Sequence, residues 1–322
     1  MTAITGKVAA TKRPGELGIH SMDNFNMVVP DLRVAEDFYK AFGLDVREEG
    51  NNLGLFTFGS DHRWASIGEG QNKKLNYLSF GVFEEDFEPM KRRIEREGIR
   101  LMDAPRGMTS NGVWFHDHNG VLIEIKISEK VSPDEKMPFS MSSAPSGTAA
   151  SPQRSKATKV KPRRLAHVLV FTADVSKAID FYARVLGLRL SDRSGDGICF
   201  MHGIHGSDHH LLAFAKSHSP GLHHCSWDVG DIDEIGRGAM QMADKGFQKG
   251  WGLGRHVLGS NFFHYVRDPW GSYSEYSSDI DYIPVTKDWP AGDYPPEDSI
   301  YLWGPDMPND FVHNFENQIE KP

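Results

Sequence analysis

The stretch from Gly221 to Tyr276 reads GLHHCSWDVGDIDEIGRGAMQMADKGFQKGWGLGRHVLGSNFFHYVRDPWGSYSEY. It begins with two histidines on a strand-like run, continues through an amphipathic helix and a Gly-rich turn, and ends on Glu275 in a second strand-like run. His224 and Glu275 would meet if the two strands lie side by side, and His167 in RLAHVLVFTAD offers a third ligand. Two imidazoles and one carboxylate form the facial triad of non-haem Fe(II) sites, which leaves coordination positions open. The stretch therefore predicts a metal site on a sheet.

The second half of the chain repeats the first. Three pairs of segments match: DLRVAEDFYKAFGLDV with DVSKAIDFYARVLGLRL, KLNYLSFGV with GLHHCSWDV, and FHDHNGVLIEI with VRDPWGSYSEY. Each half thus holds two strand–helix–strands units, and a repeat of this kind indicates a repeated architecture. One such unit cannot bury its sheet face alone, so two units are expected to pair into a cupped sheet around a cavity. The fold class expected is α+β, in two domains.

The repeat also predicts where the metal lies. Aligning the halves puts Asn24 opposite His167, Tyr77 opposite His224 and Glu124 opposite Glu275. The first half keeps the carboxylate but lacks both imidazoles. We therefore expect one metal per chain, in the second half, with the first half as a scaffold.

Composition limits the classes of partner. The chain has 322 residues and a net charge of −8, so a broad surface for nucleic acid or anionic membranes is not expected. It contains no apolar run of transmembrane length, and its N-terminus lacks the apolar core of a secretory signal. Its two cysteines, Cys199 and Cys225, imply no disulfide framework, which fits a reducing cytoplasm. The expected parts of the chain are a polar tail at 1–16, a domain without metal at 17–128, a flexible linker at 129–163, a catalytic domain at 164–284 and an arm at 285–322.

These segments resemble the type I extradiol ring-cleavage dioxygenases, the catechol 2,3-dioxygenase-like enzymes of the vicinal oxygen chelate superfamily. The resemblance runs from about Leu17 to Tyr282 and is most specific in LHHCSWDV, GLGRHVLGSNFFHYVRDPWGSYSEY and LAHVLVFTADVSKAIDFY. It implies two domains, each of two paired βαβββ modules that form a cupped mixed sheet. It also implies Fe(II), with Mn(II) as the alternative, an aromatic diol and O2 as substrates, and a homo-oligomer, either a dimer or a tetramer.

The resemblance also implies the roles of individual residues. The metal ligands would be His167, His224 and Glu275. His210 in DHHLLAF would take a proton from the substrate and return it during O–O cleavage, and a pKa near neutrality would suit both steps. His256 in GLGRH and Tyr265 in FFHY would complete the catalytic set. The candidate substrate contacts are Trp251, His256 and Tyr265, together with His202, which is expected near the cup and could line it.

Two neighbouring histidines compete for two of these roles. Side chains alternate across a strand, so only one of His223 and His224 is expected to face the cup, and likewise one of His209 and His210. The motif favours His224 and His210. The arm at 285–322 is either a lid or a subunit contact.

Two other functions fit the same fold. One is a glyoxalase-like metal-dependent isomerase or lyase, and the other is a binding protein that holds an aromatic ligand without catalysis. Oxygen uptake with a catechol separates the three, because only the dioxygenase consumes O2.

Overall fold

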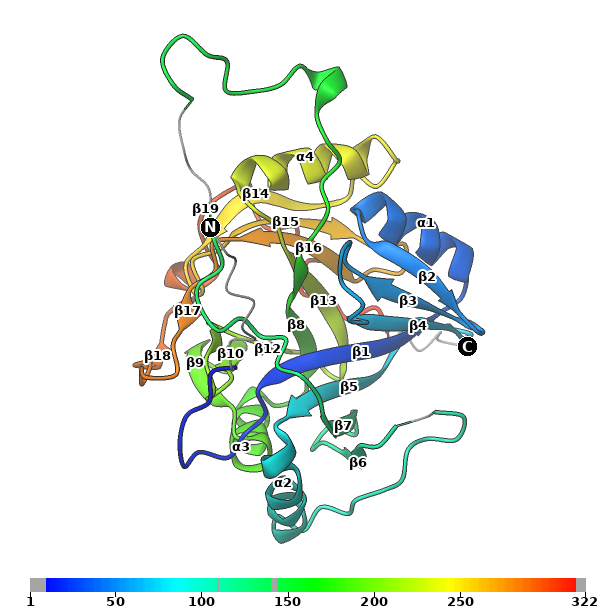
Figure 1. Cartoon of the computed structure of the whole chain (residues 1–322), viewed down its shortest axis with the longest axis vertical. Helices are drawn as coiled ribbons and strands as arrows, with labels where there is room; N and C mark the ends of the chain where they lie inside the picture. The colour runs from blue at the N-terminus through cyan, green and yellow to red at the C-terminus, as the bar shows by residue number, and fades with distance from the viewer. Residues whose placement is uncertain (1–9, 109, 140–143, 317–322) are drawn as a thin grey trace, which may run out of the picture.

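The computed structural model describes residues 10–108, 110–139 and 144–316. Within these ranges, each half of the chain forms its own large mixed sheet with two helices (Figure 1). The first sheet has the order β2-β3-β4-β1-β5-β7-β6. Its elements are β1 (Ser21–Val29), α1 (Leu32–Phe42), β2 (Asp45–Glu49), β3 (Asn52–Phe56), β4 (Ala65–Glu69), β5 (Lys74–Val82), α2 (Glu84–Arg96), β6 (Val113–His116) and β7 (Leu122–Ile127).

The second sheet has the order β18-β9-β10-β12-β8-β13-β16-β15-β14-β19. Its elements are β8 (Arg164–Thr172), α3 (Val175–Leu186), β9 (Arg189–Ser194), β10 (Ile198–His202), β12 (Leu212–Lys216), β13 (Gly221–Asp228), α4 (Ile232–Ala243), β14 (Gly250–His256), β15 (Phe262–Arg267), β16 (Tyr273–Ser278), β18 (Gly292–Asp293) and β19 (Tyr301–Trp303). The short pieces are η1 (Arg154–Lys156), η2 (Pro296–Asp298) and the pair β11 (Ser207–Asp208) and β17 (Tyr282–Ile283). The mixed sheets and the strand–helix–strands order of each unit confirm the predicted α+β class, although in the described ranges the second unit has only two strands, β6 and β7, after α2.

The repeated sequence gives repeated helix ends. At α1 the Asp31 carboxylate accepts hydrogen bonds from the first free backbone N–H groups, and Asp174 does the same at α3. Each helix ends at a glycine with positive φ, Gly43 at 101° and Gly187 at 74°. This left-handed conformation is open to glycine because it has no Cβ.

The strand register confirms the alignment of the two halves. Ser226 on β13 lies opposite His167 on β8 and opposite Glu275 on β16. Ser79 on β5 lies opposite Asn24 on β1 and opposite Glu124 on β7. The positions aligned from sequence alone are therefore equivalent in space.

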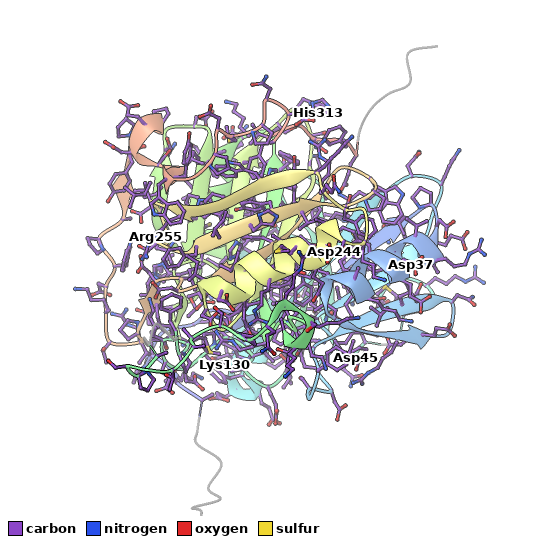
Figure 2. All side chains as sticks on the ribbon, turned by 90° about the horizontal axis from the view of Figure 1, so that it is seen from above. Asp37, Asp45, Lys130, Asp244, Arg255 and His313 are labelled. Atoms are coloured by element: carbon purple, nitrogen blue, oxygen red, sulfur yellow. The ribbon has the colours of Figure 1, made fainter. Side chains whose placement is uncertain are left out.

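The halves pack on each other through their helices. In Figure 1, α1 lies beside α4 and α2 beside α3, and each of these pairs is in contact. The Phe42 ring stacks on Tyr276 with 3.9 Å between ring centroids, which buries the end of α1 against the second sheet. Figure 2 shows α4 lying along the strands of the second sheet, next to the half that carries Asp37 and Asp45.

The connecting segments are held more closely than composition predicts. Thr11 and Lys12, from the predicted polar tail, bond to His205 and Glu85. Near the end of the predicted linker, Val160 is buried and donates its backbone N–H to Gln241. None of the described residues forms a helix long and apolar enough to cross a membrane.

Candidate active site

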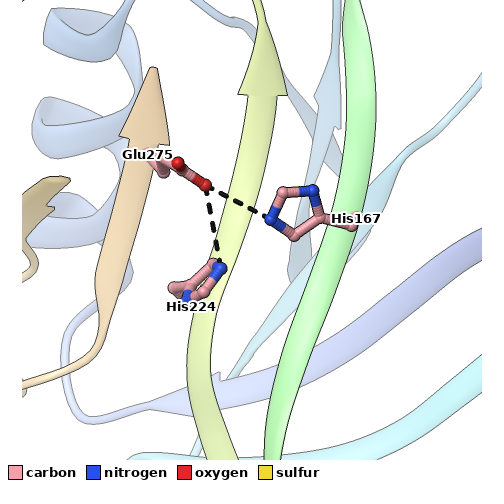
Figure 3. A group of neighbouring side chains, drawn as sticks. All are labelled: His167, His224 and Glu275. Atoms are coloured by element: carbon pink, nitrogen blue, oxygen red, sulfur yellow. Dashed lines mark ion pairs between the residues drawn. The ribbon is translucent and has the colours of Figure 1, made fainter. Parts of the chain in front are cut away.

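The three predicted ligands come together on three neighbouring strands of the second sheet. His167 lies on β8, His224 on β13 and Glu275 on β16 (Figure 3). Glu275 Oε2 lies 3.3 Å from His167 Nε2 and 3.7 Å from His224 Nε2. All three side chains are buried, and one potential ligand atom from each lies within 4.8 Å of the others.

The donor atoms fit a metal ion. His224 Nε2 and Glu275 Oε2 are buried, and neither has a hydrogen-bond partner in the described part of the chain. An unpaired buried polar atom costs about 1–3 kcal/mol, and a divalent cation would satisfy both. Burial by itself would raise the pKa of Glu275, but the imidazoles of His167, His256 and His224 around the carboxylate hold that pKa below its ordinary value. The carboxylate is therefore ready to ligate at neutral pH.

Asn261 holds the other oxygen of the Glu275 carboxylate by a hydrogen bond. Its Nδ2 donates to Glu275 Oε1 at 3.2 Å and to Ser277 Oγ at 3.0 Å. The sequence motifs described above do not identify Asn261. The feature of the sequence that could have identified it is its position just before β15, in the segment that precedes Tyr265.

His210 borders the metal-binding group without belonging to it. Its ring centroid lies 4.1 Å from that of His167, and it lines the cavity described below. Burial lowers the pKa of His210 well below its ordinary value, and nearby His167 lowers it further. The expected pKa near neutrality is thus not found, and the resting imidazole is neutral. Neighbouring His209 instead bonds to the carboxylate of Asp192.

His256 and Tyr265 face each other on β14 and β15. The His256 Nε2 and the Tyr265 hydroxyl lie 2.9 Å apart, and both residues line the cavity. Tyr265 also packs against the ring of His224 at 5.1 Å. The structure thus brings both predicted catalytic residues to the metal-binding group.

A β-bulge changes the expected alternation on β13. The register shifts between Leu222 and His224, so His223 stands at a bulge. Because a bulge breaks the two-residue period, His223 and His224 both line the cavity. The expectation that only one of the two faces the cup was wrong for this reason.

The cavity in front of the three ligands has a volume of about 560 Å³. Trp251 lines it and stacks on Tyr265, with 5.7 Å between centroids. Predicted contact His202 is not among the lining residues of the described chain; it is buried and bonds to Ser191. The apolar lining residues are Leu169, Ile198, Phe200, Ala215, Trp251, Leu258, Pro296, Ile300, Met307, Phe311 and Val312. Such a wall suits a flat apolar ligand with a few polar atoms at one end.

Known proteins resemble this chain in sequence and in fold. Residues 21–125 and 164–276 match the Glyoxalase/Bleomycin resistance protein/Dioxygenase superfamily. Metapyrocatechase 2 of Cupriavidus necator is 52% identical over 299 residues, covering 92% of this chain and 93% of that protein. An iron-dependent extradiol dioxygenase of Rhodococcus jostii is 28% identical over 156 residues, 44% of this chain and 51% of that protein. The Mn(II)-bound glyoxalase of Novosphingobium aromaticivorans shares the fold, with a TM-score of 0.75, 22% identity and coverage of 94% and 96% of the two chains.

Proposed function

This chain belongs to the Glyoxalase/Bleomycin resistance protein/Dioxygenase superfamily, and we propose that it holds one Fe(II) per chain and opens the ring of a catechol-type diol with O2. It is an extradiol dioxygenase, like the metapyrocatechase to which it is similar over nearly its whole length. The observation that carries the proposal is the open triad: His224 Nε2 and Glu275 Oε2 have no hydrogen-bond partner among the described residues, and His167 and His224 line an apolar cavity of aromatic size.

The proposed ligands are His167, His224 and Glu275. Their two nitrogens and one oxygen suit Fe(II) and also Mn(II), and the iron-dependent relative favours Fe(II). When bound, the metal supplies adjacent open positions for the diol and O2 and carries electrons between them.

The residues around the metal would handle the substrate's protons and orientation. His210, neutral at rest, would accept a proton from a diol hydroxyl and later return it as the ring opens. The Tyr265 hydroxyl and the His256 imidazole would hydrogen-bond the diol oxygens. The apolar wall, with Trp251 and Phe311, would hold the ring and exclude water. A positioned acid–base group of this kind contributes about 10²–10⁴-fold in rate.

The isomerase and the pure binding protein are not favoured. Metapyrocatechase is 52% identical to this chain, whereas the glyoxalase likeness at 22% identity concerns the fold. His210 and the Tyr265–His256 pair also have no evident task in either alternative.

Oxygen uptake tests the proposal. The chain is loaded with Fe(II) without air and mixed with a panel of catechol, alkylcatechols, bicyclic diols and trihydroxybenzenes in an oxygen electrode. We expect uptake with at least one diol and a coloured ring-opened product, and none with Zn(II)-loaded protein, since Zn(II) cannot change oxidation state. Full activity of the Zn(II) form, or no uptake with any diol, would contradict it.

The proposal includes a cytoplasmic homo-oligomer, a dimer or a tetramer. Both cysteines, Cys199 and Cys225, are free and buried, in keeping with a reducing compartment. Light scattering coupled to size exclusion would give the oligomeric state.

A further inference from the structure

The C-terminal arm, residues 285–316, surrounds the mouth of the cavity. It adds β18 to one end of the second sheet and β19 to the other. Six arm residues line the cavity: Pro296, Ser299, Ile300, Met307, Phe311 and Val312. Groups of the arm also lie at the ends of three hydrogen-bond chains that begin at histidines facing the cavity.

The shortest chain begins at His256. Its Nδ1 lies 2.6 Å from the backbone oxygen of Ile300. A carbonyl oxygen only accepts hydrogen bonds, so Nδ1 carries the proton. The Nε2 of a neutral ring is then unprotonated and accepts from the Tyr265 hydroxyl at 2.9 Å.

The second chain begins at the proposed ligand His224. Its Nδ1 lies 2.7 Å from Nδ1 of His223, and His223 Nε2 lies 2.8 Å from the backbone oxygen of Phe311. His223 must give its Nε2 proton to this carbonyl, so a neutral His223 has a lone pair on Nδ1. His224 therefore donates from Nδ1, which leaves its Nε2 unprotonated beside Glu275, as ligation requires.

The third chain begins at His210 and has the same form. His210 Nδ1 lies 3.0 Å from His209 Nδ1, and His209 Nε2 lies 2.8 Å from Asp192 Oδ2. The arm holds this carboxylate: the Gly292 N–H donates to Oδ1 at 2.8 Å, and the Trp289 indole N–H to Oδ2 at 3.3 Å. An ionised carboxylate only accepts, so a neutral His209 receives the Nδ1 proton of His210.

We infer that the C-terminal arm fixes the tautomers of His210, His224 and His256, so that each presents an unprotonated Nε2 to the cavity. His209, His223 and Asp192 are thus positioning residues. The inference rests on the proposed function for the role of each Nε2 atom. That atom would ligate the metal in His224, accept a substrate proton in His210 and accept a hydrogen bond from Tyr265 in His256. The tautomers themselves can be measured without turnover.

The direct test is ¹⁵N NMR of the full-length chain with labelled histidines, before and after loading with diamagnetic Zn(II). Signals are assigned from single histidine substitutions. We expect the proton on Nδ1 of His210, His224 and His256. A proton on Nε2 of wild-type His210 or His256 would overturn the inference.

Asp192→Asn reverses one chain by design. The Gly292 N–H, at 2.8 Å, needs an oxygen at Oδ1, so the amide NH₂ takes the place of Oδ2, gives up the longer 3.3 Å bond from Trp289 and donates to His209 Nε2. His209 then donates from Nδ1, and His210 carries its proton on Nε2, where it can no longer accept one. We expect a kcat loss of about 10²-fold or more, with KM for the diol and iron content near wild type.

Asp293→Asn is the matched control, because this exposed carboxylate lies next in the arm and bonds to Gly195 rather than to a histidine. It should change neither the tautomer of His210 nor kcat. If Asp192→Asn left the proton of His210 on Nδ1, the inference would be wrong whether or not the enzyme cleaves diols.

The hydrogen-bond chain through His223 is tested by measuring metal affinity. His223→Phe keeps a ring but removes both hydrogen bonds, and we expect a loss of metal affinity of about 10–100-fold. His264→Phe, which replaces a half-buried histidine on β15, should leave metal affinity unchanged. Equal affinity in the two variants would contradict the inferred role of His223.

Discussion

The two halves of the chain share one strand register but differ in what stands at the centre of each sheet. In the second half, a serine, Ser226, is flanked across the strands by His167 and Glu275. In the first half, Ser79 occupies the same position between Asn24 and Glu124. The backbone geometry is therefore common to both, and the chemistry depends on a few side chains.

The carboxylates of the two halves are in different states. Both oxygens of Glu124 accept hydrogen bonds, one from Ser79 and one from Ser110. Glu275 Oε2 has no such partner in the described part of the chain, and neither has the hydroxyl of Ser226. A carboxylate that is already satisfied by hydroxyls has less to gain from a metal. The carboxylate of the first half is therefore occupied by hydrogen bonds, whereas that of the second half has an oxygen free to bind a metal.

The position of His210 differs as well. In the second half, Leu212 pairs with Val168, and His210 lies two residues before Leu212. In the first half, Ala65 pairs with Phe25, and Arg63 lies two residues before Ala65, so Arg63 is the equivalent of His210. Arg63 pairs with Glu49 at 2.9 Å. A guanidinium stays protonated in proteins, so it cannot act as a base. The first half thus lacks both imidazole ligands and the proton acceptor.

Removing one imidazole should have the largest effect on this comparison. We expect His224→Ala to remove most of the metal and to reduce ring cleavage to background, because one of three ligands is lost. Tyr77→Ala, at the equivalent position of the first half, should leave the metal content at one per chain. Metal analysis after desalting measures both. Full metal retention by His224→Ala would contradict the assigned ligand set.

Removing the proton acceptor should have the next largest effect. We expect His210→Phe to lower kcat by about 10²–10⁴-fold while iron content stays near wild type, because the ring is not a ligand. Arg63→Gln is the equivalent change in the first half and should leave kcat within a few-fold of wild type. Steady-state kinetics with metal analysis of the same samples would check this. Unchanged kcat in His210→Phe would refute the acid–base role.

Restoring the missing imidazoles sharpens the comparison. Since the register is shared, the double variant Asn24→His/Tyr77→His should place two imidazoles beside Glu124. We expect a second Zn(II) site that is weaker than the first, because the hydroxyls of Ser79 and Ser110 compete for the carboxylate. Titration calorimetry would show it, with Asn24→Gln/Tyr77→Phe as the control. A stoichiometry that stays at one at high Zn(II) would mean that register alone does not define the site.

The smallest expected effect is a change in the pH dependence of stability, and it arises from one histidine in each half. Burial lowers the pKa of His20 in the first half and of His264 in the second to about 4. The pKa of an unfolded histidine is near 6.5, so between pH 6.5 and about 4 the unfolded chain binds more protons than the folded chain. The stability that the neutral histidine contributes is therefore fully present above pH 6.5 and is lost as the pH falls to about 4. His20→Phe should flatten the fall by up to about 1.4 kcal/mol per pH unit. Urea unfolding at several pH values measures this slope, and an unchanged slope would contradict it.

Much of this fold follows from local patterns in the sequence. Helices α1 and α3 begin at aspartates and end at glycines, the residue types that favour those positions, and the repeat predicted the equivalence of Tyr77 and His224. The supporting groups could not be found in this way. Asp192 reaches His209, and Phe311 reaches His223, only through tertiary contacts between distant parts of the chain. The bulge at His223 likewise depends on pairing with β8 rather than on its own strand.

The central claim is that the second half carries a redox metal and makes the chain a dioxygenase. Mass spectrometry of the product formed from a cleaved diol under ¹⁸O₂ by the Fe(II)-loaded chain tests it most directly. We expect the ring-opened product to carry both labelled oxygen atoms, allowing for exchange of an aldehyde oxygen with water, and we expect no product from the His224→Ala protein. A product with no labelled oxygen, or one formed equally well without O2, would contradict it.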